Sequence, residues 1–255
     1  MARLKDKVAI ITGATSGIGQ AAAFLFAKEG AKVAVVGRNA ERGAETVGVI
    51  KDSGGEATFI KADISKAADV GKMVKTTLDT YGRLDVLYNN AGIVHEPAST
   101  VDMGIRDWED TISANLTGSW LCMKYAIPEM IKSGGGSIIN TSSLAARVGV
   151  PNQIAYSATK GGVISMSQVT AVEYADKGIR VNCVAPGPIA TPLLVGFYGE
   201  DGVRYLSGLN PRGRLGTMDD AANVALFLAS DESAHVIGQT LMVEGGHTID
   251  SHIRW

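Results

Sequence analysis

Short runs of apolar, β-branched residues alternate along this chain with longer segments in which apolar residues recur every three or four positions. The short runs predict strands at 8–12, 32–36, 57–61, 85–89, 137–141, 180–185 and 240–244. The longer segments predict helices at 18–29, 40–52, 66–80, 107–132, 152–176 and 218–229. Strands this apolar are buried on both faces, so we expect one α/β domain over residues 1–255, with a doubly wound parallel sheet covered by helices on both sides.

One segment interrupts the alternation. Residues 186–216 combine many Gly and Pro residues with several large apolar ones. Because so long a connection inside a compact domain is usually functional, we expect a substrate lid at about 188–215. Its apolar residues predict an apolar substrate surface, packing of the lid onto the body, or a subunit interface. These residues are Leu193, Leu194, Phe197, Tyr198 and Tyr205. The tail that ends in Trp255 follows the last strand, and we expect it to be disordered unless something holds it.

Composition narrows the classes of partner. A net charge of -2 and a pI near 6.1 argue against nucleic acid, since a duplex binder needs a basic face. No apolar run approaches the roughly 18 residues that a membrane span requires, and the N-terminus leads directly into a strand and a glycine turn rather than a cleavable signal. Cys122 and Cys183 show no metal-ligand spacing, so we expect reduced thiols in a cytoplasmic protein.

The first predicted strand runs into the glycine-rich stretch TGATSGIG, residues 12–19, which opens a helix. Glycines at 13, 17 and 19 allow a tight turn and a close approach of the backbone, and the helix offers free N–H groups to a pyrophosphate. The GxxxGxG spacing differs from the commoner GxGxxG fingerprint, and glycine turns also join strands to helices where no ligand binds. The predicted dinucleotide contacts are Gly13, Thr15, Ser16, Gly17, Ile18 and Gly19.

The end of the second strand bears on the choice of cofactor. NAD-preferring sites usually carry a carboxylate here, whereas an arginine suits the 2′-phosphate of NADP. Gly37 holds the acidic position and Arg38 follows, so NADP(H) is favoured, with a solvated arginine and bound NAD(H) as the alternative. The Asp63 carboxylate, after the third strand, is expected to accept the adenine amino group. The predicted contacts in this region are Arg38, Asn39, Asp63 and Ile64.

The fourth predicted strand ends in NNAG, residues 89–92. Ligands of doubly wound folds bind at the carboxyl edge of the sheet, so Asn90, Ala91 and Gly92 are expected to contact the cofactor. The alternative is a turn stabilised by asparagine side chains.

A tyrosine and a lysine lie four positions apart in AYSATKGG, residues 155–162. On a helix, Tyr156 and Lys160 share one face, and a nearby cation lowers the pKa of a phenol toward the range of a working acid and base. The alternative is a packed tyrosine beside a solvated lysine.

Together these motifs resemble the short-chain dehydrogenase/reductases. TGATSGIG, NNAG, SANLTG, INTSS, YSATK and VAPGPIATP occur in that order, and the resemblance extends from residue 6 to about 248. It implies a single Rossmann domain with a seven-stranded parallel sheet, a nicotinamide cofactor, no metal and, usually, a homotetramer.

The resemblance also implies residue roles. Tyr156 would be the acid/base and Lys160 would lower its pKa and hold the nicotinamide ribose. Ser143, chosen over Ser142 by its spacing from the tyrosine, would bind the substrate oxygen, and Asn115 would interrupt a helix to hold a water. The nicotinamide end of the cofactor would meet Pro186, Gly187, Ile189 and Thr191. Hydride transfer would then run between nicotinamide C4 and a carbinol carbon, with Tyr156 moving the proton.

The substrate is less defined. We expect reduction of a hydrophobic ketone, or oxidation of the corresponding secondary alcohol. His95 either shapes the substrate pocket or is solvated. A 3-oxoacyl-carrier-protein reductase is the first alternative, with an acidic carrier met by Arg147, Arg204, Arg212 and Arg214. A non-catalytic nucleotide sensor or scaffold is the second alternative. Such proteins usually lose part of the catalytic set, whereas this chain keeps Ser143, Tyr156 and Lys160.

Overall fold

The structure of the protein is a computed structural model that describes residues 2–250. Trp255, for which we predicted disorder or docking, lies outside the described residues. Within them, no helix is long and apolar enough to cross a membrane.

Seven parallel strands form one sheet within the described residues, which confirms the predicted fold class. They are β1 (Val8–Thr12), β2 (Lys32–Gly37), β3 (Glu56–Lys61), β4 (Val86–Asn89), β5 (Gly136–Thr141), β6 (Ile179–Pro186) and β7 (Thr240–Val243). The spatial order is β3-β2-β1-β4-β5-β6-β7, so the direction of winding reverses between β1 and β4. In sheets of this kind ligands bind at such a reversal, outside the carboxyl ends of the strands.

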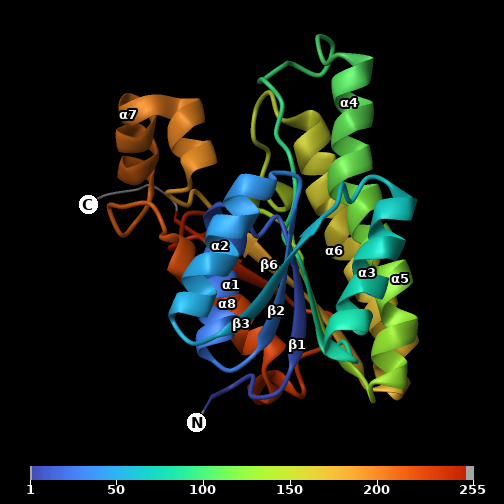
Figure 1. The fold of residues 1–255 in the computed structure, drawn as a ribbon. Coiled ribbons are helices and arrows are strands. Elements are labelled where there is room, and N and C mark those ends of the chain that lie inside the picture. Colours follow the sequence, from blue (N-terminus) through green and yellow to red (C-terminus); the bar gives the residue numbers. More distant parts are fainter. Residues whose placement is uncertain (1, 251–255) are drawn as a thin grey trace.

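Helices cover both faces of the sheet, as Figure 1 shows. One core cluster joins α1 (Gly17–Lys28), α2 (Ala40–Asp52) and α8 (Met218–Ala229) to the sheet around Phe26 and Tyr88. On the other face, α3 (Ala67–Tyr81), α5 (Gly118–Lys132) and α6 (Ile154–Tyr174) pack around Met73, Met123 and Ile138. These two layers leave the carboxyl edge of the sheet for the site.

Two regions differ from the predicted elements. The single helix expected over 107–132 is wrong, because α4 (Ile105–Thr111), a π-helical turn at Ile112–Thr117 and α5 follow one another there. The expected irregular lid contains a helix, α7 (Pro192–Leu209), broken at Gly199 with φ 62° and ψ −175°. Glycines at 196, 199, 202 and 208 obscured its helical pattern. In Figure 1, α7 and α4 rise on opposite sides of the carboxyl edge of the sheet.

Candidate active site

The glycine turn after β1 presents an open helix N-terminus. Ser16, the N-cap of α1, has extended backbone and makes no side-chain hydrogen bond to the first turn. The first N–H groups of an α-helix have no intrahelical acceptor, so they remain available to an anion. Gly13 adopts φ 66°, and a Cβ there would lie 2.9 Å from Cα of Ala91. A side chain at position 13 is therefore incompatible with the approach of the two loops.

Hydrogen bonds join this turn to the end of β4. The Thr12 hydroxyl oxygen accepts from the backbone N–H groups of Asn90 and Ala91, at 3.0 and 3.1 Å. The Asn90 amide donates to the carbonyl oxygens of Thr12 and Gly13, at 3.2 and 3.4 Å. The amide of Asn90 therefore stabilises the turn, which was the alternative reading of the NNAG motif, while Gly92 is exposed beside the site.

Thr191 lies opposite the glycine turn. Its hydroxyl oxygen accepts from the Leu194 N–H at 3.2 Å and so caps α7. A Cβ built on Gly17 would lie 3.6 Å from the Thr191 methyl group, an ordinary van der Waals distance, so the two segments lie close together, and the φ of 59° at Gly17 favours glycine there. The strand β6 ends at Pro186, and Ile189 pairs with Gly216 at the base of the lid. The glycine turn and the segment predicted to meet the nicotinamide end of the cofactor thus face each other.

The end of β2 carries the predicted cofactor-selecting residues. A Cβ on Gly37 would lie 2.6 Å from the Thr15 methyl group, so a carboxylate cannot occupy this position unless Thr15 moves. Arg38 is exposed and acts electrostatically on Asp63. Burial alone would raise the pKa of Asp63, but hydrogen bonds from Ser65 and the charge of Arg38 lower it overall. Asn39 accepts from the Arg42 N–H at 2.9 Å and caps α2.

Tyr156 and Lys160 lie together on α6, as predicted from their spacing. The Lys160 Nζ is 5.4 Å from the centroid of the Tyr156 ring. Lys160 is only 3% exposed, and its Nζ donates to the Thr141 carbonyl oxygen at 2.8 Å. Burial lowers the pKa of Lys160 to about 8. The sequence did not predict the contact with the Thr141 carbonyl, because every residue has a backbone carbonyl and the residue type does not show which one is used.

The two neighbouring serines have different partners. The Ser142 hydroxyl donates to the backbone carbonyl of Lys160 at 2.9 Å. Ser143 lies beside Tyr156, and a hydrogen bond from its side chain acts to lower the pKa of that phenol. The structure therefore brings Ser143, and not Ser142, to the tyrosine side chain.

The pKa of Tyr156 differs from the sequence-based expectation. Burial raises it above its ordinary value, and the hydrogen bond with Ser143 offsets only part of that effect. The pKa of Tyr156 is therefore raised overall, opposite to the lowering expected from the spacing of Tyr156 and Lys160.

Asn115 lies in the π-helical turn and is buried. Its carboxamide pairs with both backbone groups of Ile93, accepting from the N–H at 2.8 Å and donating to the carbonyl at 2.9 Å. π-Helical turns occur often at functional sites, and this one interrupts the helix where the resemblance placed an interruption. A Cβ on Gly92 would lie 3.1 Å from the Asn115 Oδ1 and 3.6 Å from the Lys160 Nζ. Asn115, Gly92 and Lys160 therefore enclose one corner of the site.

Other predicted residues lie farther from this cluster or are paired. His95 is partly buried, with its Nδ1 3.4 Å from the Asp107 Oδ1. Of the lid arginines, Arg204 pairs with Asp201 at 3.8 Å and Arg214 with Asp220 at 3.1 Å. Cys122 and Cys183 are both buried free thiols.

Comparison with known proteins agrees with this arrangement. The family model described as Enoyl-(Acyl carrier protein) reductase matches residues 13–248. The chain is 40% identical to the cyclohexanol dehydrogenase of Acinetobacter sp. (strain SE19), covering 96% of each chain. It is also 40% identical to the 3-oxoacyl-[acyl-carrier-protein] reductase of Synechocystis sp. (strain ATCC 27184 / PCC 6803 / Kazusa), covering 96% of this chain and 98% of that one. The crystal structure of levodione reductase superposes with a TM-score of 0.94 at 32% identity, covering 97% of this chain and 99% of the other.

A doubly wound sheet with an open glycine turn at its reversal, and with Ser143 and Lys160 beside Tyr156, defines a dinucleotide-dependent oxidoreductase. With the family match, the relationship is specific: the chain belongs to the short-chain dehydrogenase/reductase family. It is an NAD(P)-dependent oxidoreductase that acts on alcohols and ketones.

Proposed function

We propose that the enzyme interconverts a small hydrophobic ketone and its secondary alcohol, with NADP(H) preferred over NAD(H). The arrangement of Ser143, Tyr156 and Lys160 at the sheet edge is the observation that carries the reaction type. Gly37 supports the cofactor choice, since the carboxylate side chain typical of NAD sites would collide there with the Thr15 methyl group unless Thr15 moved. Arg38, exposed at the end of the strand, supplies a cation for a 2′-phosphate.

The cofactor, when bound, supplies or accepts a hydride at the nicotinamide. The Ser143 hydroxyl binds and polarises the carbonyl oxygen of the substrate. Tyr156 donates a proton to that oxygen during reduction and takes it back during oxidation. Lys160 holds the nicotinamide ribose and stabilises the tyrosinate that remains after proton donation. Asn115 keeps the 93–115 pairing that shapes the corner behind Lys160.

The remaining predicted contacts support binding of the cofactor along the carboxyl edge of the sheet. The N–H groups of residues 16–19 and the Thr191 hydroxyl lie where the pyrophosphate would bind, and Asp63 and Ile64 lie on the adenine side. Segment 188–215 acts as a substrate lid on a single catalytic domain. Its exposed apolar residues, including Leu193 and Tyr205, support a hydrophobic substrate. The likeness to a cyclohexanol dehydrogenase supports a cyclic one.

Reduction of a 3-oxoacyl group on a carrier protein is a second candidate. It is supported by the 40% identity to a reductase of that name. An acidic carrier would need exposed cations near the lid, and the side chains of Arg204 and Arg214 are 80% and 43% exposed although each pairs with an aspartate. The apolar residues of the lid, rather than these arginines, favour the small ketone.

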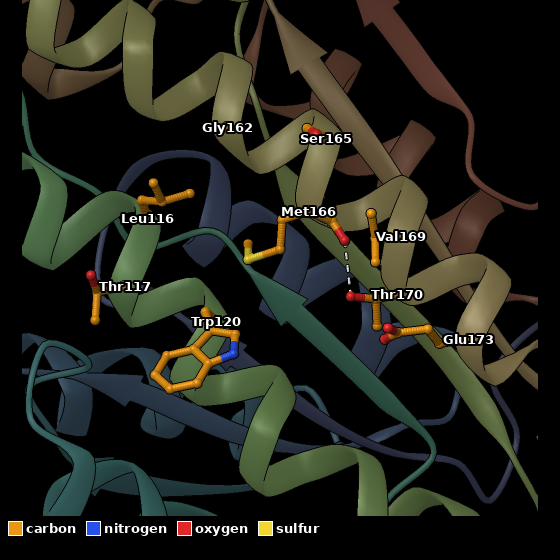
Figure 2. Close-up of a pocket in the computed structure, with 9 residues that line it drawn as sticks. All are labelled: Leu116, Thr117, Trp120, Gly162, Ser165, Met166, Val169, Thr170 and Glu173. Carbon is orange, nitrogen blue, oxygen red and sulfur yellow. Dashed lines mark hydrogen bonds between the residues drawn. The ribbon is translucent and has the colours of Figure 1, made fainter.

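We also propose that the protein is a cytoplasmic homotetramer. Two buried free thiols support a reducing compartment. Association is supported by an apolar face on α5 and α6, where Trp120, Val169 and Val172 are 46%, 56% and 81% exposed. In Figure 2, Met166 on α6 extends toward Trp120 on α5. These two residues and Val169 are among those that line a hollow of about 580 Å³. None of the four predicted catalytic residues lines this hollow, so assembly there leaves the active site accessible.

The experiment that tests this function is a cofactor titration followed by a substrate panel. The purified protein is titrated with NADPH and with NADH, and absorbance loss is then followed with cyclic ketones, diketones and acyl thioesters. We expect turnover of a cyclic ketone with NADPH. Turnover confined to acyl-carrier thioesters would support the second candidate, and a clear preference for NADH would contradict the role of Arg38.

A further inference from the structure

One polar side chain lies next to the catalytic pair and has no role in the reaction derived above. Gln153 precedes Tyr156 by three residues and Lys160 by seven, and its carbonyl oxygen accepts from the Ser157 N–H at 2.9 Å at the start of α6. Positions i, i+3 and i+7 share one face of a helix. Gln153, as the N-cap of α6, therefore begins a stripe that Tyr156 and Lys160 continue along the helix.

The backbone of Gln153 is held on both sides. Gln153 forms an isolated parallel β-bridge with Ala98, and the Ala98 N–H donates to the Asn152 carbonyl at 3.1 Å. Asn152 adopts φ 64°, one of two non-glycine residues with positive φ among residues 2–250. Such a conformation persists only where the surrounding contacts enforce it. The position of Gln153 relative to Tyr156 is thus rigid.

The side chain of Gln153, by contrast, has no protein partner. It makes no capping hydrogen bond to α6, and within the described residues its carboxamide forms no other hydrogen bond. It is only partly buried. A free amide on a fixed backbone offers one donor group and one acceptor to a ligand, while the cost of ordering the backbone has already been met by folding.

The order of Gln153, Tyr156 and Lys160 along the stripe indicates which part of the substrate the Gln153 amide would meet. In the proposed function, on which this inference rests, Lys160 meets the cofactor ribose and Tyr156 meets the reacting oxygen. Continuing in the same direction by three residues moves along the helix by about 4.5 Å, away from the cofactor. We propose that Gln153 is a specificity-determining residue that hydrogen-bonds a second oxygen on the substrate, a hydroxyl or ether oxygen one or two carbons from the reacting carbonyl.

The test uses three ring ketones that differ only at one carbon: 3-methylcyclohexanone, 3-methoxycyclohexanone and 3-hydroxycyclohexanone. We expect the wild-type enzyme to favour both oxygenated ketones over the methyl compound in kcat/KM by about three- to tenfold, the size of one net hydrogen bond. Gln153→Leu should abolish that preference while leaving the methyl compound within about twofold. Gln153→Glu keeps an acceptor but loses the donor, so it should retain the preference for the hydroxyl compound and lose it for the methoxy compound.

Gln168→Leu is the matched control, because Gln168 is an exposed glutamine on the same helix and receives the same substitution. An unchanged preference in Gln153→Leu, or an equal fall with all three ketones, would overturn the inference, since an equal fall indicates displacement of Tyr156. Wild-type turnover of the methyl compound upholds the proposed function whatever Gln153 does. Absence of turnover with all three ketones would remove both the proposed ketone reduction and the role of Gln153.

Discussion

The Lys160 ammonium nitrogen lies 2.8 Å from the carbonyl oxygen of Thr141 and 5.4 Å from the centroid of the Tyr156 ring. The backbone at the end of β5 therefore holds the Lys160 ammonium in place, and the Tyr156 phenol lies beside it on α6. Because Lys160 is buried, its positive charge is only weakly solvated, and its pKa falls to about 8. The fold maintains this unfavourable burial at the position where the proposed reaction needs a cation.

Tyr156→Phe removes the proton donor and keeps the ring. We expect kcat to fall by about 10²- to 10⁴-fold, the usual contribution of a general acid, because the substrate oxygen then lacks a proton source. NADPH affinity, measured by fluorescence titration, should stay nearly unchanged. Tyr81→Phe, at the end of α3, serves as the control. Unchanged turnover in Tyr156→Phe would exclude this residue as the acid/base.

Lys160→Met should change how stability depends on pH. In the unfolded chain lysine titrates near 10.5, whereas in the fold burial lowers the pKa of Lys160 to about 8. Between these values the unfolded chain binds more protons, so the wild type gains stability as pH rises from 8 to 10.5. At pH 7 the buried ammonium therefore destabilises the fold, and methionine removes this penalty. We expect Lys160→Met to stabilise the protein without added cofactor at pH 7 by about 1–3 kcal/mol and to abolish the rise in stability between pH 8 and 10.5. Urea unfolding of both proteins at pH 7 and pH 10 measures the difference, and identical pH slopes would contradict a buried charged Lys160.

Arg38→Met tests the choice of cofactor. If Arg38 pairs with a 2′-phosphate, its loss should raise the KM for NADPH at least about tenfold, since a charge-assisted hydrogen bond contributes roughly 1.5–3 kcal/mol. The KM for NADH should stay the same, because NADH has no such phosphate. Arg106→Met is the control, since the Arg106 side chain is 93% exposed on α4. An equal rise in KM for both cofactors would indicate a general effect on the site.

Charges introduced on the α5 and α6 face should disrupt assembly. Trp120→Glu and Val169→Glu place a carboxylate where we propose that two subunits meet, and burying an unpaired charge is costly. Light scattering after size exclusion should show smaller species for both variants. Val49→Glu on α2 introduces the same charge at a half-exposed valine outside this face, and should leave the mass unchanged. A wild-type protein that is already monomeric would contradict the tetramer.

Much of the fold was predictable from local pattern. The ends of β1, α2 and α8 agree with the predicted ranges, because strands buried on both faces appear as short continuous apolar runs and one-sided helices impose a period of 3.6 residues. The prediction of helices failed in two regions where the hydrophobic pattern does not reveal the backbone conformation. Glycines hid α7. The helical pattern of residues 107–132 did not show the change to a π-helical turn around Asn115, which only the family resemblance had indicated.

The sequence by itself determined the class of fold, the glycine turn and the pairing of Tyr156 with Lys160, because each depends on neighbours a few residues apart. Only the tertiary structure decided that Ser143 meets Tyr156, that Thr191 faces Gly17, and that the Thr141 carbonyl holds Lys160. It also reversed the direction expected for the Tyr156 pKa, from lowered to raised. These relations join separate strands and loops, and burial depends on everything packed around a group. Local sequence patterns report on neighbours within a few residues, so they do not show which distant segments pack together.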